Sequence, residues 1–196
     1  MKFFKKIFFV ILISSFISSS NAKDPIEFIS GITDTASNIL KEDISIEEKA
    51  DKLIILAEKT VDIDGIGLYS LGKHRKSISD DLLNRYKVSF RNYFLKSFSS
   101  RLSQYSDPKI NVISQNVIND KYTIVSSVLV ETEDRPEIKI DWRVYTKDPN
   151  KPLIRDLIIE GLSLARTQKE EFSSILSSNN NDINVLFAKL EEFINN

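Results

Sequence analysis

The side chains that could do chemistry are few in this chain. It contains no cysteine, so thiol catalysis is excluded. His74 is the only histidine, which excludes a metal site that needs two histidines and leaves no Ser-His-Asp triad except one built on His74. The charged neighbours Lys73, Arg75 and Lys76 indicate that His74 is exposed. We therefore expect no catalytic histidine, no metal and no cofactor.

One pair of side chains could serve acid–base catalysis. Asp141 and Tyr145 fall on the same face of a strand predicted at residues 137–146, and an isomerase can use a carboxylate base with a tyrosine donor. Lys139 and Arg143 share that face, which favours ion pairs or a solvated ladder. We therefore expect a protein that is not an enzyme, with a small-molecule isomerase as the alternative.

Residues 73–76 form the only compact basic cluster of the sequence. Such a cluster is typical of a solvated loop. Alternatively, it could be a contact point for anionic lipid or for an acidic partner surface.

A long amphipathic helix is predicted at residues 79–105. Ser79 is a good N-cap, Asp80 and Asp81 favour the positive end of the helix, and no glycine or proline interrupts the segment. The apolar face is rich in aromatic rings, and it is either core on a sheet or the lining of a cavity for an apolar ligand. That face comprises Leu83, Tyr86, Phe90, Tyr93, Phe94, Ser97, Phe98, Leu102 and Tyr105.

The remaining elements place this helix in an α+β domain. Capping signals at residues 24–27 and 45–48 predict two helices before it. After residues 106–108 the hydrophobic period changes from 3.6 to 2, and short turns indicate antiparallel neighbours. Strands are predicted at 109–117, 122–131, 137–146 and 153–160, and helices at 163–177 and from 182 onward.

The N-terminus predicts export. Residues 1–6 are basic, residues 7–17 form an apolar run too short to span a bilayer, and Ser20 and Ala22 are the small residues that signal peptidase needs. We expect a signal peptide at 1–22, cleavage near Ala22, and a single domain at 23–196.

The net charge of the predicted mature chain is −4. Without the three lysines of the signal peptide, the chain has 24 basic and 28 acidic residues. A general nucleic-acid binder is therefore excluded.

Several segments together resemble a known family, the MlaC family, also called toluene-tolerance or ABC-transporter auxiliary proteins. The resemblance extends over nearly all of the chain after residue 22, although His74 and Arg75 stand where the family commonly has an aromatic pair. The segments, in order, are Val61-Asp62-Ile63, Tyr69-Ser70-Leu71-Gly72, the helix with Phe90, Phe94 and Leu102, Asp141-Trp142-Arg143-Val144, and Asp156-Leu157-Ile158-Ile159-Glu160-Gly161-Leu162-Ser163-Leu164.

The resemblance implies a periplasmic phospholipid carrier that maintains outer-membrane lipid asymmetry. The partners implied are an outer-membrane lipoprotein complex and an inner-membrane ABC transporter complex with its substrate-binding subunit, and the phospholipid is cargo. The fold implied is a four-stranded antiparallel curved sheet packed against several helices and enclosing an apolar cavity, in a monomer. A periplasmic chaperone for lipidated proteins remains an alternative.

Ten apolar residues are the predicted lining of that cavity, with plain core packing as the alternative for each. Four lie on the long helix and six on the third and fourth predicted strands. They are Leu83, Phe90, Phe94 and Phe98, facing Ile138, Ile140, Trp142, Val144, Leu157 and Ile159.

Overall fold

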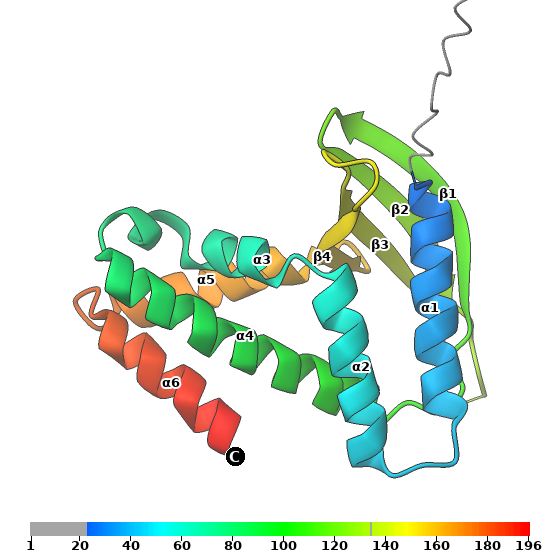
Figure 1. Cartoon of the computed structure of the whole chain (residues 1–196), viewed down its shortest axis with the longest axis horizontal. Helices are drawn as coiled ribbons and strands as arrows, with labels where there is room; N and C mark the ends of the chain where they lie inside the picture. The colour runs from blue at the N-terminus through cyan, green and yellow to red at the C-terminus, as the bar shows by residue number, and fades with distance from the viewer. Residues whose placement is uncertain (1–22, 134) are drawn as a thin grey trace, which may run out of the picture.

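The computed structural model describes residues 23–133 and 135–196, so the predicted signal peptide lies outside the described residues. This part of the chain has the predicted α+β order of helices, an antiparallel meander and helices again (Figure 1). The helices are α1 (Pro25–Lys41), α2 (Ile46–Thr60), α3 (Ile63–Leu71), the 3-10 helix η1 (Gly72–Lys76), α4 (Asp80–Leu102), α5 (Leu164–Ser177) and α6 (Ile183–Asn195). The strands are β1 (Ile110–Asn119), β2 (Tyr122–Leu129), β3 (Ile138–Tyr145), β4 (Leu153–Ile159) and β5 (Leu162–Ser163).

The described strands form one antiparallel sheet in the order β1-β2-β3-β4-β5. The four predicted strands are confirmed, and the two-residue β5 adds a fifth that folds back on β4. Glu160 and Gly161 make this turn with φ angles of 49° and 81°. Glycine suits the second position because a side chain there would be strained.

Irregular pairing bends the sheet. The register of β1 against β2 shifts between Val112 and Ser114 and again between Val117 and Asn119. A third shift between Arg143 and Val144 leaves Arg155 of β4 without a paired residue on β3. Such bulges increase the local twist, and the strands curve across the view in Figure 1.

Local capping sets where the helices begin. The Asp24 carboxylate accepts a hydrogen bond from the Ile26 N–H at 2.8 Å, and Pro25 occupies the first helical position. Ser45 and Glu48 form a reciprocal capping box at α2, and Ser79 accepts from the Leu82 N–H at α4. These predicted starts are confirmed, whereas α4 ends at Leu102 and not at residue 105.

The molecule has two arms (Figure 1). In the helical arm, α3, α4, α5 and α6 share one core cluster centred on Tyr86, Phe90, Phe172 and Phe187. In the sheet arm, α1 packs on β1 and β2 over a second cluster that contains Ile29, Val125, Trp142 and Val144. A third, smaller cluster joins α1 and α2 to the end of α4.

The passage from α2 to α3 joins the two arms. Val61 packs against both main clusters and forms a parallel bridge with Ile154 of β4. The next residue, Asp62, donates its N–H to the Ile154 carbonyl at 2.9 Å, and its carboxylate accepts from Arg155 Nε at 2.5 Å. This short segment therefore fixes the helical arm to the sheet.

No helix in the described ranges 23–133 and 135–196 has the length and apolar character needed to cross a membrane.

Candidate functional site

The four predicted lining residues of α4 lie in two clusters. Leu83, Phe90 and Phe94 belong to the helical arm, while Phe98 packs in the third cluster with α1 and α2. Phe90 is 2% exposed, whereas Phe94 and Phe98 are half-buried. The rings of Phe94 and Phe98 are stacked, with centroids 5.9 Å apart and an interplanar angle of 10°. Phe90 is therefore core, and the stacked pair forms the accessible part of the face.

The six predicted lining residues of the strands come together in the sheet arm. Ile140, Trp142 and Val144 are buried on one face of β3, as the alternation predicted, and Ile138 is half-buried beside them. Leu157 packs against the same cluster, and the half-buried Ile159 pairs with Ile140. The structure thus gathers the strand half of the predicted set in the sheet arm but divides the α4 half between the helical arm and the third cluster.

The helix that covers Trp142 is not the one that we expected. We predicted that α4 faces this strand, but α4 packs mainly on α2, α3 and α6, and α1 covers the sheet. Phe28, Ile29 and Ile32 of α1 pack on the cluster that contains Trp142. The capping signal at residues 24–27 predicted a helix here, but it carried no information on which surface the helix covers.

A short polar chain runs through the buried face of the sheet. The Trp142 Nε1–H donates to Ser127 Oγ at 2.9 Å, and Ser127 in turn donates to the Ile140 carbonyl at 3.1 Å. Because each buried polar atom has a partner, the indole is held in one orientation without an unsatisfied donor. Trp142 therefore forms a fixed part of the apolar wall.

Two surface hollows among the described residues are lined by none of the ten predicted residues. A groove of about 430 Å³ lies between α2 and α4, where Ile54 and Leu95 contribute to its apolar part. A larger hollow of about 750 Å³ lies between η1 and α5. Both are open to solvent, so the enclosed apolar cavity that the sequence led us to expect is not one of them.

His74 is placed differently from our expectation. We predicted that its charged neighbours would keep it exposed, but the residue is only 8% exposed. It lies in η1, where it lines the larger hollow together with Lys73 and residues of α5. The charges of its sequence neighbours therefore did not predict its burial.

The acid–base pair considered for an isomerase is engaged in structural contacts. Asp141 accepts a hydrogen bond from Ser126 Oγ at 2.6 Å. The Arg155 guanidinium stacks on the Tyr145 ring, 3.8 Å from its centroid. Both side chains are therefore held by neighbours on the half-buried face of the sheet.

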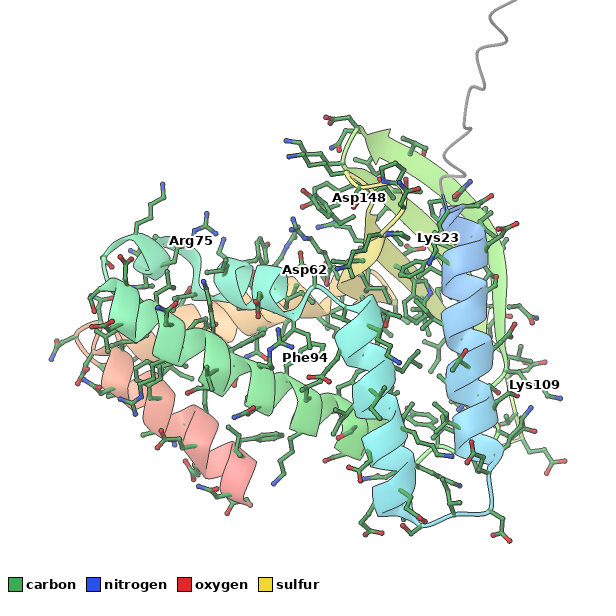
Figure 2. The ribbon with its side chains drawn as sticks, in the orientation of Figure 1. Lys23, Asp62, Arg75, Phe94, Lys109 and Asp148 are labelled. Atoms are coloured by element: carbon green, nitrogen blue, oxygen red, sulfur yellow. The ribbon has the colours of Figure 1, made fainter. Side chains whose placement is uncertain are left out.

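Arg155 organises the polar side of the junction between the arms. It donates to Asp62 and, at 2.8 Å, to the Tyr122 hydroxyl (Figure 2 labels Asp62 there). Partial burial disfavours the charged guanidinium, but these hydrogen bonds and the Asp62 charge raise the pKa of Arg155 overall. Sequence reasoning missed this cluster, because its members come from three distant segments.

The one buried carboxylate of the sheet is also accounted for. Asp156 is 3% exposed and accepts hydrogen bonds from Ser163 Oγ at 2.6 Å and from the Ala165 N–H at 3.0 Å. It therefore caps the start of α5 and turns the chain from β5 into that helix. Residues 23–133 and 135–196 contain no group of three or more His, Cys, Asp or Glu side chains placed to hold a metal ion.

Comparison with known proteins decides the family. The family described as MlaC protein matches residues 31–192, which include the whole sheet and the helices from α2 to α5. The chain belongs to the MlaC family. The resemblance that the sequence suggested is therefore confirmed.

A solved structure has the same fold. A phospholipid-binding protein from Ralstonia solanacearum, determined in complex with a phospholipid, aligns with a TM-score of 0.73. The two chains are 17% identical, and the match covers 88% of this chain and 97% of that one. The MlaC-family chain described here thus shares its architecture with that protein over almost its entire length. No match was found among curated proteins.

Proposed function

We propose that this protein is a periplasmic phospholipid carrier. The observation that carries the proposal is membership of the MlaC family over residues 31–192, with the same fold as a protein solved with a bound phospholipid. On this proposal residues 1–22 are a signal peptide that is removed on export, and residues 23–196 are the carrier.

The physical need for a carrier follows from the cost of wetting lipid tails. Two acyl chains with about 30 methylenes would cost on the order of 24 kcal/mol to expose, at about 0.8 kcal/mol each. A phospholipid therefore needs an apolar slot to cross an aqueous compartment. A slot needs apolar walls and no catalytic cluster, so this function requires no chemistry of the protein.

We place the slot between the helical arm and the sheet arm. Each arm supplies half-buried apolar side chains whose burial would increase when a tail is bound: Phe94 and Phe98 from α4, and Leu157 and Ile159 from β4. The buried Phe90 and Val144 belong to the clusters against which Phe94 and Leu157 pack. The two clusters meet at Val61, so a tail that enters there would contact both walls.

The partners follow from the proposed role. A carrier receives its lipid from one membrane-bound assembly and delivers it to another. We propose an outer-membrane lipoprotein complex and an inner-membrane ABC transporter complex with its substrate-binding subunit, served by a monomer. Together they would maintain the lipid asymmetry of the outer membrane.

Native mass spectrometry of protein purified from the periplasm tests the carrier function. We expect a bound mass that matches a diacyl phospholipid. A protein that is reproducibly empty contradicts the proposal, and a retained lipidated peptide indicates a chaperone for lipoproteins instead.

The position of the slot needs its own test. A phospholipid with a photoreactive diazirine on one tail is expected to label Phe94, Phe98, Leu157 or Ile159, as mapped by peptide mass spectrometry. We also expect Leu157→Gln to lose bound lipid while keeping its circular dichroism spectrum. Leu162→Gln is the matched control, because Leu162 is 59% exposed on the neighbouring β5. Labelling confined to α6, or equal lipid content in both variants, would place the slot elsewhere.

A further inference from the structure

The larger hollow lies on the helical arm, away from the walls assigned to the lipid tails. Its volume of about 750 Å³ is within the range of small-molecule sites. Figure 2 labels Arg75 on η1, at the end of the molecule opposite the sheet-arm residues Lys23 and Lys109. The lining residues are Tyr69, Lys73 and His74 from α3 and η1, Arg166, Lys169, Glu170, Ser173, Ser174 and Ser177 from α5, and Asn181.

Positive charge dominates the wall of this hollow. Lys73, Arg166 and Lys169 are its fixed cations, and Glu170 is its one carboxylate. Within the described part of the chain, none of these four side chains forms an ion pair with protein. The Lys169 ammonium instead lies 5.1 Å from the centroid of the Tyr69 ring. The three cations are therefore available to a ligand.

His74 adds a buried polar side chain that has no hydrogen-bond partner among residues 23–133 and 135–196. The residue is 92% buried, yet its ring makes no hydrogen bond with any described residue. Of the side-chain nitrogen and oxygen atoms described, Arg135 Nε is the one that is both unpaired and sealed from solvent. The ring nitrogens of His74 are not among such sealed atoms, and the residue lines the hollow. An unpaired imidazole in the lining of a basic hollow is a ready hydrogen-bond partner for a ligand.

We propose that this hollow binds a phosphate group. The guanidinium of Arg166 offers a planar fork that matches two phosphate oxygens, and Lys73 and Lys169 supply point charges. The hydroxyls of Ser173 and Ser174 are additional donors on the same wall. A cation or a purely apolar ligand would leave these charges uncompensated. The phosphate belongs either to a soluble phosphate ester or to the headgroup of an anionic lipid at a membrane surface.

Calorimetry and vesicle flotation at low salt test the site with two probes. One probe is inorganic phosphate, and the other is a vesicle of phosphatidylcholine mixed with phosphatidylglycerol, compared with phosphatidylcholine alone. The test variant is Arg166→Gln/Lys169→Gln, and the matched control is Arg85→Gln/Lys189→Gln, which removes two charges outside the hollow. We expect the test variant to bind at least about tenfold more weakly and the control to bind like the parent.

The outcomes distinguish a soluble phosphate ester from a lipid headgroup, and they distinguish the hollow from the slot for the lipid tails. Loss of phosphate binding in the test variant assigns a soluble ester, and loss confined to the phosphatidylglycerol vesicles assigns a membrane headgroup. The proposal is overturned if neither probe binds, or if the control loses as much affinity as the test variant. Phospholipid content by native mass spectrometry is expected to stay unchanged in the test variant, since the hollow is separate from the tail slot. Loss of bound phospholipid in the test variant would show that the hollow and the tail slot are not separate sites.

Discussion

The two arms of the molecule bury apolar surface in different ways. In the helical arm, Phe90 lies at the centre of a network of rings, with centroids of Tyr86, Tyr93, Phe94 and Phe172 at 5.8 to 6.2 Å. The sheet-arm cluster is mainly aliphatic, with Trp142 and Phe28 as its aromatic members, and this arm carries the buried hydroxyls of residues 123 and 127. Ring networks depend on orientation as well as on area, so the helical arm is the more specifically packed of the two.

This difference divides the predicted lipid-binding residues by role. A side chain in the centre of the ring network supports the fold and has little freedom to yield to a tail. The half-buried Phe94 and Phe98 lie at the margin of that network, and Leu157 and Ile159 lie at the margin of the sheet cluster. The comparison therefore predicts that stability depends on the centre of each arm and lipid retention on its margin.

The largest effect is expected from Phe90→Ala. Removing the central ring leaves a cavity among four other rings, and such truncations cost about 3 to 5 kcal/mol of unfolding free energy. Phe98→Ala is the matched variant at the margin and should cost clearly less, while reducing bound phospholipid. Urea unfolding of lipid-free protein measures the change in unfolding free energy, and native mass spectrometry measures the amount of bound phospholipid. Equal destabilisation by the two variants would mean that centre and margin do not differ.

A smaller effect is expected from glycine substitutions that contrast the arms. A Cβ at Gly67 of α3 would lie 2.6 Å from Phe90 Cδ1, whereas one at Gly31 of α1 would meet no atom within 4 Å. Gly67→Ala should therefore lose about 1 to 3 kcal/mol through overpacking, which exceeds its gain in helix propensity. Gly31→Ala should gain about 0.5 to 1 kcal/mol. Thermal unfolding measures the stability change of both variants. If Gly67→Ala is stabilising, the Phe90 ring can move to make room for the added methyl group.

The smallest effect at neutral pH is expected from Tyr86→Phe. The Tyr86 hydroxyl donates to the Gly67 carbonyl at 2.9 Å, so its loss should cost about 1 kcal/mol. Burial, and to a lesser extent Tyr93, raises the pKa of Tyr86 well above its ordinary value.

That shift predicts a sign for the pH dependence. Above the ordinary tyrosine pKa of about 10, this hydroxyl ionises in the unfolded chain but stays protonated in the folded protein. The folded state then binds more protons, so the stability of the parent falls as the pH rises. The variant lacks this group, so its deficit relative to the parent should shrink above pH 10. Urea midpoints across that range check the prediction, and a constant deficit would contradict it.

The parts of the fold that depend on neighbouring residues were predictable from the sequence. Asp24, Ser45 and Ser79 cap their helices as expected, since a cap is satisfied within three residues. The alternation of β3 likewise showed which face is buried. The family was also recognisable, because its segments occur in order along the chain.

The contacts between distant segments were not predictable. Periodicity showed that two helices have apolar faces, but not that α1 covers the sheet while α4 packs on other helices. The burial of His74 was predicted wrongly as well, because the charges of its sequence neighbours do not determine it; the α5 residues that line the same hollow lie about ninety residues further along the chain. The Asp62–Arg155 pair depends on a bulge in β4, which no local pattern indicates.

The edge strand β1 has a consequence for solubility. Its outer side pairs with no other described strand, and Ile113, Val117 and Ile118 are more than half exposed along it. A straight apolar edge of this kind would invite a second molecule to add its own strand and begin an aggregate. The two register shifts in β1 interrupt the run of free backbone donors and acceptors along this edge. The irregularities that bend the sheet therefore also reduce self-association at high concentration.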